Sequence, residues 1–240
     1  MNTVQVEFWA RRALFTDPIT KTGKEKSTYH IPTYQALKGM MESVYWKPTI
    51  VWLIDRVRIL NPIKMEFCGM KLPFSGLDGR SNDLAVYTYL KDVRYQVEAH
   101  FEWCQPREDL IQDRNIKKHS HIVNRMISRG GRRDIFFGSR ECQGYVKPCE
   151  FGEDEGFYDN YGDINYSLMF HGFNYPNETG EDMLKARLWR PVMQNGIINF
   201  PRPDDKSLII KDIRGMRKTV LLTSGFNEEG LLDDYIEEVN

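Results

Sequence analysis

The sequence predicts an α+β protein with a ferredoxin-like main domain, an inserted β-hairpin and a small β-rich C-terminal extension. Three patterns support this prediction: apolar and polar residues alternate through Asp92–Cys104, and apolar residues recur at helical spacing after Pro32 and again after Asn115. With residues 63–91 set aside as the hairpin, the order up to residue 148 is strand, helix, strand, strand, helix, strand. In that arrangement both helices cover one face of an antiparallel sheet.

The N-terminal part supplies the first strand and the first helix. Thr3–Trp9 alternates as a strand does, and residues 10–30 mix Arg, Lys, Gly and Pro, which predicts a long basic loop. Pro32 suits the first position of a helix. That helix should end near Trp46, because Pro48 disfavours helical geometry in the residue before it.

The middle of the chain supplies the central strands. Thr49–Leu60 is rich in β-branched and aromatic residues and predicts a strand, and Ile63–Met70 is expected to pair back on it. Pro73–Asp83 has the composition of an exposed loop. Asp92–Cys104 is the clearest strand, with Val93 and every second residue after it on the apolar side.

The second helix begins after Asn115, whose side chain can accept a hydrogen bond from a free backbone amide one turn later. The helical spacing continues for about four turns until Gly130 and Gly131 end it. Ile135–Val146 then supplies one or two strand segments, interrupted at Gly138.

Beyond residue 148 the composition changes, so we place a domain of residues 1–148 before a small β-sheet extension of residues 149–240. Phe151–Asn165 is acidic and rich in glycine, as a linker or flap is. The extension is expected to contain two strands, one helical segment and a strongly acidic tail: Tyr166–Tyr175, Ile197–Phe200, Asp182–Trp189 and Asn227–Asn240.

The net charge of −1 conceals two segments of opposite charge. Residues 1–148 carry 24 Lys and Arg against 16 Asp and Glu, a net charge of +8, whereas residues 149–240 carry 9 against 18, a net charge of −9. The basic part is suited to a polyanion. The alternative is that the two parts simply attract each other.

Several classes of protein are excluded by what the sequence lacks. No run of eighteen apolar residues and no secretory signal is present, so we expect no membrane partner. The four cysteines show no CxxC pairing, which favours a reduced, cytoplasmic chain over a zinc ribbon. No P-loop, GxSxG or strand-linked GxGxxG motif occurs, so nucleotide hydrolysis and hydrolase-triad chemistry have no support, and we expect no cofactor.

A concentration of positive charge begins with the second helix. Residues 114–140 hold one acid, Asp134, against eight cations: Arg114, Lys117, Lys118, Arg125, Arg129, Arg132, Arg133 and Arg140. His119 lies beside Lys118 at a helix N-terminus, which favours anions, and an imidazole exchanges protons near neutral pH. This combination indicates chemistry on a phosphodiester, although a histidine on the apolar side of a helix is about as often a packed core residue.

Three further candidates carry less weight. Tyr45 can hydrogen-bond a hydroxyl or transfer a proton, although a free phenol is a weak base at neutral pH and an aromatic residue at a helix end usually belongs to the core. A metal site on His119 and His121 is disfavoured because residues two apart on a helix point to nearly opposite sides, so no metal is expected. The basic segment Arg129–Arg133 is either a solvated helix exit or, as we favour, a phosphate contact.

Together these residues resemble a known family, the type I-C CRISPR-associated RAMP endoribonucleases, which are the fifth Cas family, subtype d. The resemblance extends from residue 4 to about 203. It is carried by six segments: Arg12–Pro18, Pro32–Gly39, Tyr45–Pro48, Lys118–His119, Gly130–Asp134 and Phe137–Cys142.

The resemblance implies an RRM-like domain and metal-independent cleavage of precursor CRISPR RNA at the 3′ base of the repeat hairpin. The products would carry a 5′-hydroxyl and a 2′,3′-cyclic phosphate, and the protein would stay on the 5′ handle beside the backbone and large subunits of the interference complex. The family's catalytic tyrosine, lysine and histidine correspond to Tyr45, Lys118 and His119. The alternatives are a non-catalytic RNA-binding subunit that caps the 5′ end, and a protein scaffold with no RNA affinity.

Overall fold

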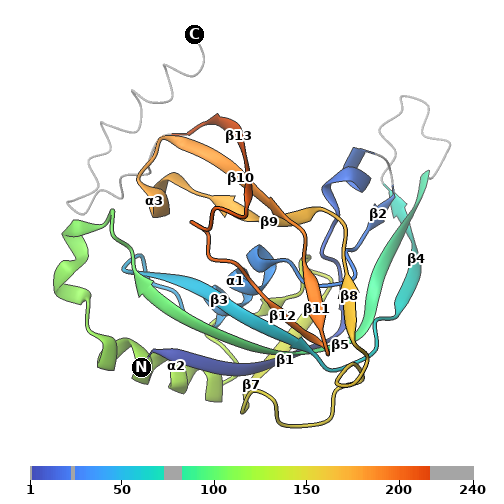
Figure 1. Cartoon of the computed structure of the whole chain (residues 1–240), viewed down its shortest axis with the longest axis horizontal. Coiled ribbons are helices and arrows are strands. Elements are labelled where there is room, and N and C mark those ends of the chain that lie inside the picture. Colours follow the sequence, from blue (N-terminus) through green and yellow to red (C-terminus); the bar gives the residue numbers. More distant parts are fainter. Residues whose placement is uncertain (1, 23–24, 73–82, 217–240) are drawn as a thin grey trace.

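The computed structural model describes residues 2–22, 25–72 and 83–216, and its largest element is a ten-stranded sheet (Figure 1). Its main path has the order β6-β7-β1-β5-β3-β12-β11-β8, while β2 and β4 pair with β5 outside this path. All pairings in it are antiparallel except that of β2 with β5. The strands of this sheet are β1 (Thr3–Ala13), β2 (Lys26–Ser27), β3 (Ile50–Ile59), β4 (Met65–Leu72), β5 (Asp83–Trp103), β6 (Ile135–Phe136), β7 (Gln143–Pro148), β8 (Asp163–Asn165), β11 (Val192–Gln194) and β12 (Ile197–Asn199).

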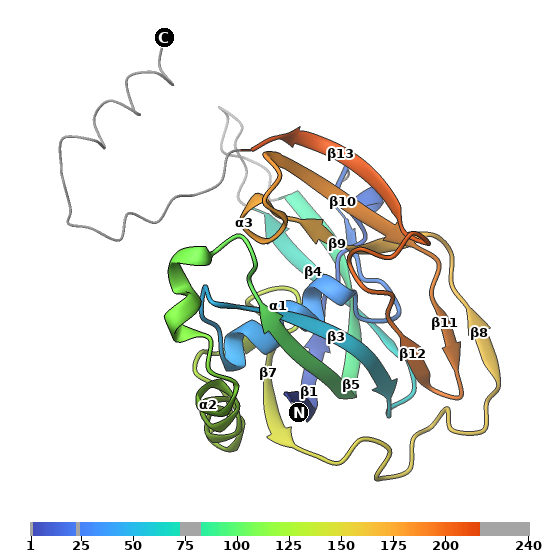
Figure 2. The ribbon, with the colours of Figure 1, turned by 60° about the vertical axis from the view of Figure 1, so that its left-hand side comes forward.

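A second, three-stranded sheet lies on the other side of helix α1 (Tyr34–Val44), so that α1 is enclosed between two sheets (Figure 2). Its order is β13-β10-β9, and the short helix α3 follows β9 in the chain. These elements are β9 (Met169–Asn174), α3 (Pro176–Thr179), β10 (Met183–Trp189) and β13 (Ile209–Gly215). Helix α2 (Ile116–Ser128) lies outside this stack, near β7.

The two sides of β5 determine where the core forms. Val97 and Ala99 are fully buried toward the helices, as the alternation predicts. Gln96, on the opposite side, is also fully buried, because the segment after β7 covers that face. Helix α1 fits this core because Thr33 caps it by accepting a hydrogen bond from the amide of Ala36.

Some predicted elements differ in the N-terminal half. The expected loop of residues 10–30 is wrong in part: β1 continues to Ala13, and the 3₁₀ helix η1 (Pro18–Thr22) and β2 follow it. Pairing of β1 with the long strand β5 continues to Ala13 and overrides the loop-like composition. Pro32 precedes the helix rather than opening it, because Thr33 is the N-cap.

The predicted hairpin partner is also wrong. β4 pairs with β5, from Met65 opposite Leu90 to Leu72 opposite Asp83, and not with β3. The reason is that β5 starts at Asp83, nine residues before the expected Asp92, and offers β4 a continuous edge. Residues 73–82 of the expected loop Pro73–Asp83 lie outside the described residues, as does the acidic tail Asn227–Asn240.

In the C-terminal segment, the helix expected at Asp182–Trp189 is wrong, because β10 occupies this stretch. Helix-forming residues such as Leu184 and Ala186 take an extended form here because β9 and β13 pair with both edges of β10. Strand β12 pairs with β3, so part of the segment after residue 148 extends the main sheet. The domain boundary after residue 148 stays a prediction.

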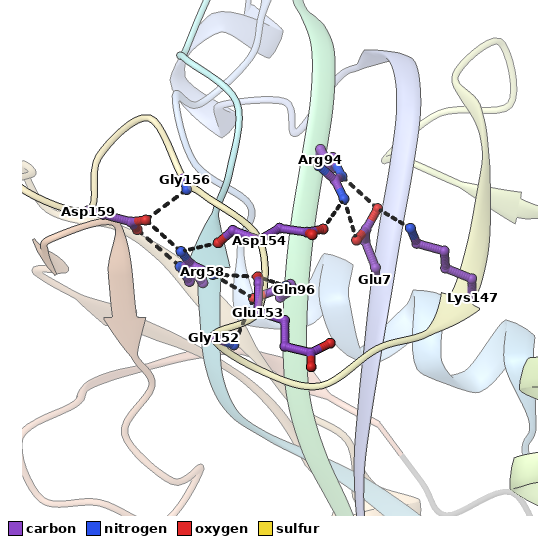
Figure 3. A network of polar contacts seen from close by, with 10 residues as sticks. All are labelled: Glu7, Arg58, Arg94, Gln96, Lys147, Gly152, Glu153, Asp154, Gly156 and Asp159. Atoms are coloured by element: carbon purple, nitrogen blue, oxygen red, sulfur yellow. Dashed lines mark hydrogen bonds and ion pairs between the residues drawn. The ribbon is translucent and has the colours of Figure 1, made fainter.

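Hydrogen bonds and an ion pair hold the acidic segment Phe151–Asn165 against the face of the main sheet that carries Arg58 and Gln96 (Figure 3). Arg58 donates to both carboxylate oxygens of Asp159 at 3.1 and 2.7 Å and to the backbone oxygens of Glu153 and Asp154. Gln96 also donates to the Glu153 oxygen. A buried guanidinium with this many acceptors holds the segment firmly.

Among the described residues, no helix has both the length and the apolar character that crossing a membrane requires.

Candidate active site

The site is centred on a contact between the end of α1 and the first turn of α2. Tyr45, directly after α1, places its hydroxyl 2.9 Å from Nδ1 of His119. The other ring nitrogen, Nε2, lies 2.8 Å from the backbone oxygen of Asp113. Because a carbonyl oxygen can only accept, Nε2 carries the proton, and Nδ1 of the neutral ring accepts from the Tyr45 hydroxyl. Two residues 74 positions apart in the chain are therefore joined at one imidazole.

Asp113, the last residue of the 3₁₀ helix η2 (Glu108–Asp113), organises the remaining groups. One carboxylate oxygen is paired with the Lys118 ammonium, and the other accepts a 2.7 Å hydrogen bond from the hydroxyl of Thr49. The second oxygen also lies 3.5 Å from Nε2 of His119. Sequence patterns gave no sign of Asp113, which lies one residue before the basic run and belongs to no motif.

Burial separates the three predicted catalytic side chains. His119 is 0% exposed and Tyr45 2% exposed, whereas the Lys118 side chain is half-exposed. Trp103 and Phe101 present edges to the imidazole, with ring centroids at 5.6 and 6.2 Å. In this state the imidazole is closed off by aromatic rings and by η2, while the ammonium already reaches the surface.

The electrostatic environment restricts what each group can do. Burial, and then the nearby Asp113 charge, raise the pKa of Tyr45, while Arg132 opposes them. The hydrogen bonds from Lys118 and Thr49 lower the pKa of Asp113, so its carboxylate is ionised at neutral pH. A phenol with a raised pKa is a hydrogen-bond donor and a poor base.

Backbone hydrogen bonds from the predicted basic segment Arg129–Arg133 hold the end of α1 beside the end of α2. Gly130 and Gly131, with φ of 83° and 106°, turn the chain back at the end of α2. The amides of Arg132 and Arg133 then donate to the oxygens of Val44 and Ser43 at 3.1 and 3.0 Å. These oxygens belong to the last turn of α1 and would otherwise lack partners, so the turn places cations next to Tyr45.

The predicted RNA contacts share one property. Each is exposed and forms no ion pair with any residue that the structure describes: Lys117, Arg125, Arg129, Arg132, Arg133 and Arg140. Lone exposed cations on one helix and the connection after it leave positive charge free for a polyanion. Their role in RNA binding stays a prediction.

The other histidines have separate environments. His121 is exposed while His119 is buried, so the two do not share a face of α2. His100 bonds Asp55 at 2.8 Å, which raises the pKa of its imidazole, and His171, on β9 of the small sheet, is buried against Tyr34 of α1. Within residues 2–22, 25–72 and 83–216, no three His, Cys, Asp or Glu side chains gather as a metal site.

Comparison with known proteins gives a consistent result. A curated relative from Mannheimia succiniciproducens, named CRISPR pre-crRNA endoribonuclease Cas5d, is 30% identical over 235 residues, which cover 83% of this chain and 95% of the relative. A relative of the same name from Thermus thermophilus is 26% identical over 181 residues, covering 71% and 75%. A solved structure described as a CRISPR-associated protein is 33% identical with a TM-score of 0.71, covering 87% of this chain and 96% of that one.

The family profile Cas_Cas5d, described as CRISPR-associated protein (Cas_Cas5), matches residues 3–201, which is most of the chain. This range agrees with the extent of the resemblance drawn from the six segments, and the predicted family is confirmed. The chain belongs to the Cas5d family of CRISPR-associated proteins.

Proposed function

We propose that this protein cleaves precursor CRISPR RNA at the 3′ base of the repeat hairpin, by attack of a 2′-hydroxyl on the adjacent phosphate. The observation that carries the proposal is the 2.9 Å contact between the Tyr45 hydroxyl and His119 Nδ1, beside the Lys118 ammonium. The two relatives named as pre-crRNA endoribonucleases support it. The products would be a 5′-hydroxyl and a 2′,3′-cyclic phosphate.

His119 is the proton-transfer group of this proposal, and Lys118 stabilises charge on the pentacoordinate phosphorane. The reaction needs a base for the 2′-hydroxyl, an acid for the departing 5′-oxygen and positive charge at the phosphate. Nε2 of His119 points toward η2 and becomes the nitrogen that faces RNA when Asp113 moves away. With the ring proton on Nδ1, where it is donated to the Tyr45 oxygen, Nε2 takes the proton of the 2′-hydroxyl and then passes it to the departing 5′-oxygen. Tyr45 holds Nδ1 from the opposite side and thereby fixes the ring orientation.

The burial of His119 requires that RNA binding open the site. A phosphate that approaches Lys118 competes with the Asp113 carboxylate for the same ammonium, and the two anions repel each other. Displacing Asp113 also releases its backbone oxygen from His119 Nε2, since both contacts belong to one residue. Substrate binding and exposure of the imidazole are thereby coupled.

We also propose that the site lies on a ferredoxin-like, RRM-like core. This core consists of β1, α1, β3, β5, α2 and β7. The sheet order β7-β1-β5-β3 supports this assignment, because the first and third strands lie at the centre as that arrangement requires. Residues 149–240 would then be an extension built on this core.

A second function, a non-catalytic subunit that only caps the 5′ end of the guide RNA, is favoured by the burial of His119 and Tyr45. Purified protein incubated with repeat RNA in EDTA separates the two. We expect cleavage, with products bearing 2′,3′-cyclic phosphate, and no cleavage when the attacking nucleotide is 2′-deoxy. Absence of cleavage of the all-ribose RNA, with binding intact, would establish the capping role instead.

We also propose that the protein retains the 5′ handle and joins the interference complex through it. The exposed, unpaired cations of α2 and the connection after it, among the residues that the structure describes, support this, because their contacts with phosphate do not depend on the scissile bond. Cleaved repeat RNA should co-elute with the protein on size exclusion at low salt and separate at high salt. Release of the 5′ handle at low salt would contradict retention.

A further inference from the structure

An aromatic pair with one exposed and one partly buried ring lies on the main sheet, on the face away from the helices. Trp9 on β1 and Tyr145 on β7 are opposite each other in the strand register, and their rings stack with centroids 5.7 Å apart at an interplanar angle of 29°. Tyr145 is 56% exposed. A cross-strand aromatic pair can simply stabilise a sheet, but here a large aromatic face remains open to solvent.

Beside this pair lies a groove that carries both cations and acids. Trp9 and Lys147 line this groove of about 440 Å³, together with Arg11, Arg94 and the acids Glu7 and Asp92. Glu7 is buried and accepts from Arg94 at 2.6 and 2.9 Å, and Lys147 lies 3.3 Å from it, so one carboxylate is shared by two cations (Figure 3). Arg94 also pairs with Asp154 at 2.5 Å.

Lys147 and Arg11 are the cations of this groove whose side chains are most open to solvent. The Lys147 ammonium lies 5.8 Å from the centre of the Trp9 ring, and its side chain is half-exposed. Arg11 is exposed and has no ion pair within the part of the chain that the structure describes. Flat aromatic faces beside cations are the features that bind single-stranded nucleic acid, since every base has a π-face and every linkage has a phosphate.

The position of the pair connects it with the candidate active site. Val146, between Tyr145 and Lys147, is buried on the side of α2, so the two exposed side chains point to the opposite face of the sheet. β7 has only the two-residue strand β6 beyond it in the described part of the sheet. The exposed cations Arg132, Arg133 and Arg140 belong to the connection between α2 and β7, so positive charge follows the chain from the candidate active site to the strand that carries Tyr145.

We propose that the Trp9–Tyr145 pair is a stacking platform for an unpaired base of the repeat RNA, with Lys147 and Arg11 on the flanking phosphates. This inference rests on the proposed function, because it takes the same RNA as ligand. The platform binds outside the hairpin, where bases are not already stacked in a duplex. It contributes affinity and leaves the chemical step unchanged.

The experiment measures binding of a repeat hairpin with its single-stranded flanks, made non-cleavable by a 2′-deoxy nucleotide at the attacking position. Tyr145→Val removes the ring and keeps a residue suited to a strand. Tyr161→Val is the matched control, since Tyr161 is 61% exposed in the acidic segment. We expect Tyr145→Val to weaken binding about 5- to 100-fold, as loss of one stacked base does, and Tyr161→Val to leave it unchanged.

Abasic substitution of the flanking nucleotides, one at a time, locates the stacked base. One position should weaken binding by wild type and have no further effect on Tyr145→Val, because the two changes remove the same contact. If Tyr145→Val fails to give a native circular dichroism spectrum, Tyr145→Phe and Lys147→Gln replace it, with binding retained in the first and lowered in the second.

Equal affinities of Tyr145→Val and wild type would overturn the platform, as would an abasic scan with no sensitive position. Either result would leave the surface to a protein partner. The proposed function fails independently: if wild type does not cleave all-ribose RNA while Tyr145→Val still loses affinity, the platform stands and the endoribonuclease does not. Cleavage by wild type with unchanged binding by Tyr145→Val would support the endoribonuclease and overturn the platform.

Discussion

Two histidines are fully buried at opposite ends of α1, and both lie against a tyrosine. At its C-terminal end His119 accepts from Tyr45, and at its N-terminal end His171 stacks on Tyr34 with ring centroids 4.3 Å apart. Each has 0% exposure and each donates from Nε2 to a backbone oxygen, of Asp113 or of Pro201. By burial and hydrogen-bond count the two sites are nearly the same.

The difference is in the group that each Nδ1 faces. Nδ1 of His171 accepts a 3.1 Å hydrogen bond from Arg187, a permanent cation, and burial with this charge lowers the pKa of His171 to about 3. His119 faces a neutral phenol and lies near the Asp113 carboxylate. A histidine locked in its neutral form cannot carry protons at neutral pH, so proton transfer requires the neighbours of His119, and burial alone does not mark a functional histidine.

The largest expected effect is the loss of cleavage when His119, and not His171, is replaced. His119→Ala should lower the single-turnover cleavage rate by about 10²- to 10⁴-fold, the usual contribution of a general acid or base, and leave salt-sensitive RNA binding intact. His171→Gln should cleave at the wild-type rate below its unfolding temperature. Rapid-quench cleavage with saturating enzyme measures both. A wild-type rate for His119→Ala would remove the imidazole from the mechanism.

The next largest effect concerns the Lys118 ammonium, the neighbour of His119 in the chain. Lys118→Gln should lower the cleavage rate about 100-fold, because charge on the phosphorane loses its stabilising cation. Lys117→Gln, one residue earlier and also exposed, is the matched control and should weaken binding without changing the rate at saturation. Single-turnover rates at saturating enzyme and binding curves separate the two effects. Equal rate losses in both variants would show that the basic turn acts only through overall charge.

The sequence predicted the local part of this site well. The Asn115 cap and the end of α2 at the two glycines follow from local rules, and the structure has both. The alternation in β5 also identified the buried face. These features depend on residues within one or two turns of each other, which is why one sequence is sufficient for them.

The parts that the sequence could not supply depend on long-range pairing. Asp113 lies in a 3₁₀ helix without any motif, and its role arises only when Thr49 and Lys118 meet it in space. β10 has helix-forming residues and becomes a strand because two other strands pair with it. The hydrogen bonds that join α1 to α2 through the amides of Arg132 and Arg133 likewise link residues that are far apart in the sequence.

A third expected effect is on the pH dependence of stability, and it comes from His171. Its folded-state pKa is lower than its unfolded value of about 6.5, so the unfolded chain binds the extra proton. His171 therefore contributes stability that is present above pH 6.5 and lost as the pH falls toward 3, with a slope approaching about 1.4 kcal/mol per pH unit. Urea unfolding of wild type and His171→Gln between about pH 6.5 and 5 measures it.

The difference in unfolding free energy between wild type and His171→Gln separates the contribution of His171 from those of other titratable groups. His100 has a raised pKa, so its contribution to stability is kept in this window: below the pKa of the unfolded chain its imidazole is protonated in both the folded and the unfolded protein. Asp113, with a lowered pKa, loses its contribution only at more acidic pH. Parallel pH profiles for wild type and His171→Gln would show that His171 is not held neutral by Arg187.

The smallest effect decides whether Tyr45 orients His119 or deprotonates the 2′-hydroxyl. Burial raises the pKa of its phenol, which argues against deprotonation of the 2′-hydroxyl and for a hydrogen bond that orients His119. Loss of one such bond changes a rate by about fivefold, so Tyr45→Phe should cleave about five times more slowly at saturation. Tyr34→Phe, at the His171 end of α1, should cleave at the wild-type rate. A loss of about 100-fold or more in Tyr45→Phe would make the phenol a proton-transfer group itself, and the pH dependence of cleavage would then shift in this variant.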